Sequence, residues 1–127
     1  MKRRILVVED NQASRELLCD WLEAEGCEVQ VAGNLEQAFA ALKSQRPPDA
    51  ILLDVQLGPE DGLAVARRVR QEANLQGLPV IAVTAQAMPA EQERIIRAGC
   101  NACAAKPVNL KELGEHLERW LKPSARQ

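Results

Sequence analysis

The stretch Ile5-Leu-Val-Val-Glu-Asp-Asn11 decides how the rest of the chain is interpreted. Its four consecutive apolar residues show no polar alternation, which is typical of a strand buried on both faces, as the strands of a parallel sheet are. Two carboxylates, Glu9 and Asp10, follow at once. A second run of the same kind, Ala50-Ile-Leu-Leu53, is followed by Asp54. The two runs predict buried strands whose carboxyl ends carry acidic side chains.

Outward from these two runs, strand-like and helix-like patterns alternate along the chain. We expect strands over residues 2–9, 28–31, 49–53, 78–83 and 102–105, and helices over residues 12–25, 35–44, about 61–74, 89–98 and 109–121. Five strands alternating with five helices predict an α/β fold, a doubly wound, flavodoxin-like, five-stranded parallel sheet in the order 2-1-3-4-5. This order places strands 1 and 3 side by side. Glu9, Asp10 and Asp54 are therefore expected to meet in one crevice.

Length and composition bound the class of protein. The chain has 127 residues, of which 46% are hydrophobic and 27% charged, as in an ordinary globular domain. We expect one domain over residues 1–122 and a disordered C-terminal tail over residues 123–127. The formal net charge of −2 and the lack of a long basic run argue against nucleic-acid binding. Met1 and the short tail favour a free-standing protein.

No segment of the sequence is typical of export or of a membrane span. The apolar run after Met1-Lys-Arg-Arg4 ends at Glu9, whereas a signal peptide needs about 7–15 apolar residues. No stretch approaches the ~20 apolar residues of a membrane-spanning helix. We therefore expect a cytoplasmic protein whose cysteines are free thiols: Cys19, Cys27, Cys100 and Cys103.

Two other polar clusters have ordinary structural explanations. The spacing of Cys100 and Cys103 resembles half a zinc site, but the sequence has no second Cys or His pair, which favours packing in a strand. Three arginines share one expected helix, namely Arg67, Arg68 and Arg70. Such a cluster is ordinarily a solvated helix face, and we expect these side chains in solvent.

The chemistry of the expected crevice follows from its side chains. Carboxylates that converge without a partner repel one another, and a hard divalent cation relieves this repulsion. Mg²⁺ prefers oxygen ligands and usually takes one or two protein carboxylates directly. Thr84, at the end of the fourth strand, and Lys106, at the end of the fifth, are expected at the same edge of the sheet. The Thr84 hydroxyl can donate a hydrogen bond, and the Lys106 ammonium is a compact charge suited to a phosphate oxygen.

The motifs at these strand ends resemble those of response-regulator receiver domains, the CheY-like family of two-component signalling, over essentially the whole chain. The matching pieces are Ile5-Leu-Val-Val-Glu-Asp-Asn11, Leu52-Leu-Asp54 with Asp61-Gly62, Val83-Thr-Ala85 and Ala105-Lys-Pro107. Each motif is unspecific by itself, whereas their order and their placement at strand ends are specific. The segment 82–107 most resembles single-domain cell-cycle or phosphorelay regulators and the receivers of hybrid kinases.

Carried over residue by residue, the resemblance implies a phosphoacceptor signalling domain rather than an enzyme. Asp54 would accept a phosphoryl group from a histidine kinase or a histidine phosphotransfer protein. Mg²⁺ would be bound directly by Asp10 and through water by Glu9. Asp54 itself and the backbone carbonyl of Gln56 would complete the protein ligands.

The same resemblance implies how the phosphoryl group is held and used. Thr84 would hydrogen-bond the group, and Lys106 would neutralise its charge. The only reactions would be self-phosphorylation from a donor and autodephosphorylation. A monomer or weak homodimer would then signal by contact with a downstream protein.

Two positions depart from the family pattern. Cys103 stands three residues before Lys106, where the family usually has Tyr or Phe, whose ring swings inward when the threonine moves toward the phosphate. Gly58 stands four residues after Asp54, where the family normally has proline, and Pro59 follows. Neither position touches the phosphorylation chemistry, but both bear on how the signal is transmitted.

Three other classes of protein fit these residues less well. A haloacid-dehalogenase-type phosphatase needs a second Asp two residues after its nucleophile, where Gln56 stands. A dinucleotide-binding enzyme needs a glycine-rich turn after the first strand, and residues 9–12 contain no glycine. A structural adaptor of this fold would usually lack one of Asp10, Asp54 or Lys106, and all three are present.

Overall fold

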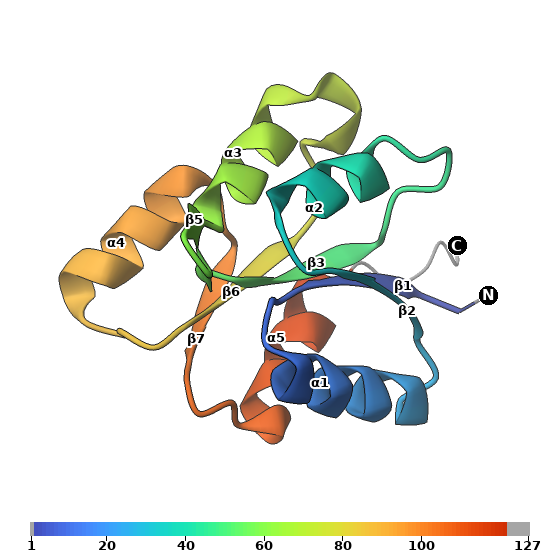
Figure 1. Cartoon of the computed structure of the whole chain (residues 1–127), viewed down its shortest axis with the longest axis horizontal. Helices are drawn as coiled ribbons and strands as arrows, with labels where there is room; N and C mark the ends of the chain where they lie inside the picture. The colour runs from blue at the N-terminus through green and yellow to red at the C-terminus, as the bar shows by residue number, and fades with distance from the viewer. Residues whose placement is uncertain (1, 122–127) are drawn as a thin grey trace.

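Five parallel strands form the centre of the structure, and helices cover both of their faces (Figure 1). The computed structural model describes residues 2–121. The strands are β1 (Arg4–Val8), β2 (Glu28–Ala32), β3 (Ala50–Asp54), β6 (Val80–Thr84) and β7 (Ala102–Ala105), in the spatial order β2-β1-β3-β6-β7. Counted along the chain within this sheet, that order is the predicted 2-1-3-4-5. The expected tail at 123–127 and the expected domain end at 122 lie outside the described residues.

The helices divide between the two faces of the sheet. They are α1 (Gln12–Ala24), α2 (Leu35–Leu42), α3 (Leu63–Gln71), α4 (Pro89–Ala98) and α5 (Leu110–Trp120). Helices α1 and α5 cover one face, and α2, α3 and α4 cover the other (Figure 1). Three of the helices begin at an asparagine whose side chain accepts a backbone N–H of the first turn: Asn11, Asn34 and Asn109.

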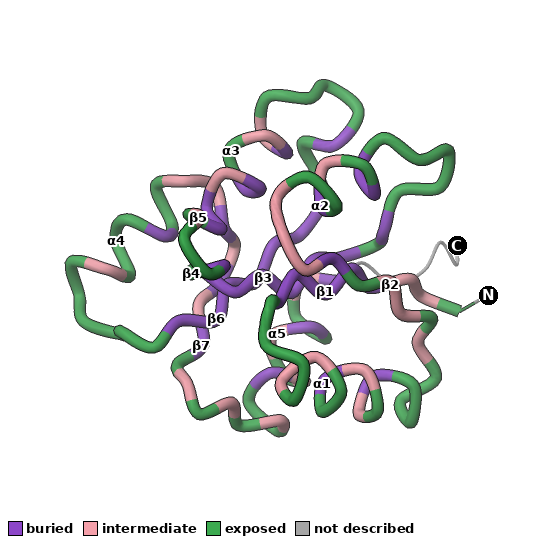
Figure 2. The backbone as a smooth tube through the Cα atoms, in the orientation of Figure 1, coloured by how far each residue is buried: buried purple, intermediate pink, exposed green. Residues whose placement is uncertain are grey.

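Strand β1 is buried on both sides, as its uninterrupted apolar run predicts. Leu6 and Val8 pack in the core beneath α2, α3 and α4, whereas Ile5 and Val7 pack in the core beneath α1 and α5. Figure 2 shows that the residues of the central strands are buried, whereas exposed residues recur along the helices and the loops. Full burial of such a side chain contributes about 1.5–3 kcal/mol to folding. The central strands are therefore a firm support for the residues at their carboxyl ends.

The segment between β3 and α3 differs from the sequence prediction. The short strands β4 (Gln56–Leu57) and β5 (Glu60–Asp61) form an antiparallel hairpin where we expected a loop. Gly58 begins its two-residue turn with a φ of 57°, a conformation that glycine adopts without strain. Helix α3 accordingly starts at Leu63 instead of residue 61, and it ends at Gln71 before a 3₁₀ turn over Ala73–Leu75.

The arginine cluster of α3 is only partly in solvent. Arg67 is exposed, as expected, but the prediction is wrong for Arg70. The Arg70 guanidinium turns toward the sheet and donates hydrogen bonds of 2.7–2.9 Å to the carbonyls of Gln76, Leu78 and Gly99 and to the side chain of Asn101. A long side chain on a helix edge can thus reach backbone acceptors of the neighbouring loops. This single residue ties α3 to the end of α4.

The cysteines and the helices agree with two further expectations. All four cysteines are free thiols. Cys100 is buried, and burial raises the pKa of its thiol to about 12, so this sulfur is an apolar core group. None of the helices within residues 2–121 is long and apolar enough to cross a membrane.

Candidate functional site

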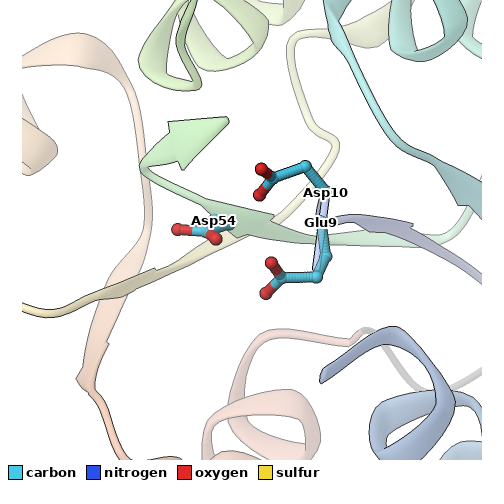
Figure 3. A group of neighbouring side chains, drawn as sticks. All are labelled: Glu9, Asp10 and Asp54. Carbon is cyan, nitrogen blue, oxygen red and sulfur yellow. The ribbon is translucent and has the colours of Figure 1, made fainter. Parts of the chain in front are cut away.

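Three carboxylates meet at the carboxyl ends of β1 and β3. Glu9 and Asp10 follow β1, and Asp54 is the last residue of the neighbouring strand β3 (Figure 3). One oxygen from each side chain lies within 4.8 Å of the other two. Glu9 and Asp54 are 3% and 5% exposed, whereas Asp10 faces solvent. The predicted convergence of these residues is what the sheet order produces.

Lys106 supplies the positive charge of this cluster. It follows β7, and its Nζ lies 2.9 Å from Oδ2 of Asp54 and 3.8 Å from Oε1 of Glu9. Its backbone N–H donates to the carbonyl of Thr84, which fixes the segment beside β6. Burial by itself lowers the pKa of Lys106, but the hydrogen bond and the charge of Asp54 outweigh burial, and the pKa is raised. The ammonium therefore stays charged against the carboxylates.

Glu9 is the strained member of the cluster. Burial, together with the hydrogen bond and the charge of Asp54, raises the pKa of Glu9 to about 7. Three carboxylates face one ammonium, so negative charge is in excess when Glu9 is ionised. Oxygen ligands at this spacing, with excess negative charge, fit a hard divalent cation such as Mg²⁺.

The backbone around Asp54 is closely packed. A Cβ on Gly62 would lie 2.0 Å from the carbonyl oxygen of Asp54, so only glycine allows the hairpin to return here. The other carboxylate oxygen of Asp54, Oδ1, accepts the backbone N–H of Gln56 at 3.1 Å. The Asp61 side chain accepts the N–H of Leu63, the first residue of α3. The Asp61-Gly62 pair therefore serves to place the chain tightly behind the carboxylate.

A pocket of about 700 Å³ opens above these side chains, and all six residues predicted for the site line it: Glu9, Asp10, Asp54, Gln56, Thr84 and Lys106. Five of the six lie at or just beyond the carboxyl ends of the central strands, and Gln56 lies in the hairpin. The structure thus gathers the complete predicted set. Thr84, however, does not direct its hydroxyl at Asp54.

The Thr84 hydroxyl lies on the α4 side of the pocket. Its Oγ1 is 3.2 Å from the carbonyl of Gln86 and 3.4 Å from Oε2 of Glu91, and it accepts the N–H of Gln86 at 3.1 Å. A hydroxyl has one proton, so it can donate to one of these acceptors at a time. Cys103 on β7 is half-buried and packs against the core under α2, α3 and α4.

Two pocket residues were missed by the sequence analysis. Glu91 and Arg94, both from α4, line the pocket beside Thr84. Arg94 donates to both carboxylate oxygens of Glu91, at 2.9 and 3.3 Å, and lies 3.4 Å from Asp61. The hydrogen bond from Arg94 lowers the pKa of Glu91, so the carboxylate is charged at neutral pH. An acid and a base three residues apart at the start of the helix after Thr84 were the available signal.

Comparison with known families agrees with this geometry. The model of the response regulator receiver domain family matches residues 5–118. The polar-differentiation response regulator DivK of Brucella anthropi is 36% identical over 121 residues, covering 95% of this chain and 98% of that protein. DivK of Brucella abortus is 36% identical over 122 residues, with the same coverage.

Solved structures show the same similarity. A putative response regulator from Chloroflexus aurantiacus has a TM-score of 0.89 and 31% identity, covering 95% of this chain and 98% of that one. The receiver domain of a sensor histidine kinase from Pseudomonas aeruginosa has a TM-score of 0.83 and 34% identity, with the same coverage. That receiver was crystallised with a magnesium ion coordinated in its active-site cleft.

Proposed function

This chain belongs to the family of response-regulator receiver domains, the phosphoacceptor domains of two-component signalling, and from that premise we propose that Asp54 accepts the phosphoryl group. The observation that carries the proposal is the buried Asp54 carboxylate, held 2.9 Å from the Lys106 ammonium at the base of a pocket. The carboxylate lines the pocket, so a donor can approach it from that side. Access for the donor is one requirement of a nucleophile.

The acidic cluster is the proposed site of Mg²⁺. Asp10, Asp54 and the backbone carbonyl of Gln56 would hold the ion, with Glu9 as the outer carboxylate. When bound, Mg²⁺ supplies positive charge that shields the carboxylates and the phosphoryl oxygens from one another. The excess negative charge around Glu9 supports this assignment, because a cation relieves it.

The remaining roles belong to the chain itself. One carboxylate oxygen of Asp54 forms a bond to phosphorus, while the bond between phosphorus and the donor breaks and the donor keeps its electron pair. Lys106 lies close enough to neutralise the charge brought by the phosphoryl oxygens. The Thr84 hydroxyl would donate a hydrogen bond to one of those oxygens after giving up its hydrogen bond to the carbonyl of Gln86. Phosphoryl transfer depends mainly on such positioning and charge stabilisation.

Loss of the phosphoryl group and the choice of partners complete the proposal. Water reaches the pocket beside the exposed Asp10, so hydrolysis would return Asp54 to its free form. The donor would be a histidine kinase or a histidine phosphotransfer protein, and the output would be contact with a downstream protein. A cytoplasmic location, the monomer or weak homodimer, and the single domain over 1–122 stay predictions.

Intact-mass analysis after incubation with acetyl phosphate and Mg²⁺ tests the proposal. We expect a single phosphoryl adduct that base removes and that does not form in excess EDTA. Asp54→Asn should abolish the adduct, because an amide is a poor nucleophile. Asp20→Asn, a change of the same chemistry on the exposed face of α1, should leave it unchanged. An undiminished adduct on Asp54→Asn would place the phosphorylation site elsewhere, and no adduct at all would indicate an adaptor.

A further inference from the structure

The hydroxyl of Thr84 is occupied on the side of the pocket away from Asp54. Its two acceptors are the carbonyl of Gln86 and the carboxylate of Glu91, at 3.2 and 3.4 Å. Because the hydroxyl has one proton, donating to a phosphoryl oxygen requires that both contacts be given up. The Thr84 hydroxyl thus has hydrogen-bond acceptors within reach before any phosphoryl group is present.

The carboxylate that accepts from Thr84 is itself fixed in place. Glu91 has a 16% exposed side chain, and Arg94 donates to both of its oxygens. Arg94 also lies 3.4 Å from Asp61 in the hairpin that follows Asp54. A row of four pocket-lining side chains, Thr84, Glu91, Arg94 and Asp61, therefore runs from the end of β6 to the hairpin. We call this row the Glu91 bridge.

We propose that Glu91 is a positioning residue, which holds the Thr84 hydroxyl toward α4 and thereby opposes its turn to the phosphoryl group. This inference rests on the proposed phosphorylation at Asp54. A contact made only in the free state favours that state by its own free energy, and losing the contact shifts the equilibrium toward the bound state. Removing the Glu91 carboxylate should therefore tighten the binding of a phosphoryl mimic.

A simple charge effect makes a different prediction. Removing a negative charge beside the pocket would favour any anion, whether or not Thr84 is involved. Charge alone also requires opposite effects from removing Glu91 and removing Arg94. If the Glu91 bridge holds Thr84, both changes should tighten the binding of the phosphoryl mimic, because without Arg94 the Glu91 carboxylate is no longer held beside Thr84.

Beryllofluoride binding separates these cases. At a fixed saturating Mg²⁺ concentration, amide signals of residues 54–58 are followed as beryllofluoride is added. The variants are Glu91→Ala, Arg94→Gln, and Glu91→Ala in the Thr84→Val background. Glu93→Ala is the matched control, because Glu93 lies on the same helix and pairs with Arg97 in solvent. A thermal melt of each variant checks that it is folded.

We expect Glu91→Ala to lower the half-saturating beryllofluoride concentration about two- to tenfold, the value of one hydrogen bond. Arg94→Gln should lower it less, Glu93→Ala should leave it unchanged, and Glu91→Ala should have no effect once Thr84 is valine. Equal binding by Glu91→Ala and Glu93→Ala would overturn the proposal. The proposal would also be overturned if Glu91→Ala and Arg94→Gln changed the half-saturating beryllofluoride concentration in opposite directions. The same holds if Glu91→Ala still lowered that concentration in the Thr84→Val background. Failure of the unaltered protein to bind beryllofluoride or accept phosphate would instead contradict the proposed function.

Discussion

The β1–β3 side of the pocket and its α4 side are built from contacts of different strength. On the first side, buried carboxylates at strand ends face an ammonium 2.9 Å from Asp54. On the second, the Thr84 hydroxyl makes contacts of 3.2 and 3.4 Å, one of them to a side chain from an exposed helix turn. Strands buried on both faces cannot shift without losing core contacts. The carboxylates and the Lys106 ammonium, which we call the fixed side of the pocket, are thus held in place by the core. The Thr84 hydroxyl and its acceptors, which we call the responsive side, are held by contacts that are easily exchanged.

The largest effect should come from Asp10→Ala, on the fixed side. Asp10 is the exposed carboxylate of the cluster and the proposed direct ligand of Mg²⁺. We expect a loss of Mg²⁺ affinity of more than about tenfold, and with it a loss of phosphorylation by acetyl phosphate. Isothermal titration with Mg²⁺ and intact mass measure the two losses. Normal phosphorylation of this variant in EDTA would disprove the acidic-cluster model.

Lys106→Ala should leave Mg²⁺ binding largely intact but weaken the response of residues 84–89 to a phosphoryl mimic. The change removes a charge and no ligand, so Mg²⁺ affinity should stay within about threefold of the parent or rise slightly, by loss of local positive charge. Beryllofluoride should bind more weakly, because its charge is no longer neutralised. Amide shifts in residues 84–89 at saturation should be smaller than in the parent. Full-sized shifts there would mean that the α4 side responds without Lys106.

Glu9→Gln, on the β1–β3 side, should change how the stability of the protein depends on pH. The folded-state pKa of Glu9 is about 7 against 4.5 for the free side chain, so the folded state holds a proton that the unfolded state releases. Stability of the metal-free protein should therefore fall as pH rises from about 4.5 to about 7, by on the order of 2 kcal/mol relative to Glu9→Gln. Thermal melts of both proteins in EDTA measure this difference. A difference that stays constant between these pH values would contradict the strained environment of Glu9.

Cys103 should give the smallest effect, on the responsive side. A cysteine buries less apolar area than an aromatic ring when it moves, so β7 gains little from a rearrangement. We expect amide shifts on beryllofluoride binding to centre on residues 84–89, with partners contacting that loop and the first turn of α4. Cys103→Ala should leave phosphorylation and partner binding unchanged. Large shifts centred on 102–104 beside a quiet loop, or lost partner binding in this variant, would refute the expectation.

The fixed side could be predicted almost completely from the sequence. Residues 5–8 and 50–53 are uninterrupted apolar runs, and such runs allow few structures other than buried parallel strands. Once the strand order is set, the residues after each run must meet, so Glu9, Asp10 and Asp54 follow from topology. Their convergence within 4.8 Å needed no information about side-chain conformation.

The responsive side could not be predicted in the same way. Strands β4 and β5 have two residues each, too few for any periodic pattern. The inward turn of Arg70 and the contact of Thr84 with Glu91 depend on side-chain conformations between segments that no sequence spacing relates. Glu91 and Arg94 did carry a signal as an acid and a base at adjacent turns. Their neighbour across the pocket, Asp61, could be identified only after folding.

The two ends of α4 are held differently. Its C-terminal end is clamped, because Gly99 accepts a hydrogen bond from Arg70 at 2.8 Å, whereas its first residue follows Met88, whose side chain makes no capping bond. Ten residues of α-helix are about 15 Å long, so a tilt of about 10° around Gly99 would move the first turn by roughly 2.5 Å. The same tilt hardly displaces the core residues near Gly99, at the C-terminal end of the helix. A change near Thr84 would therefore move the first turn of α4 while the end at Gly99 stays in place.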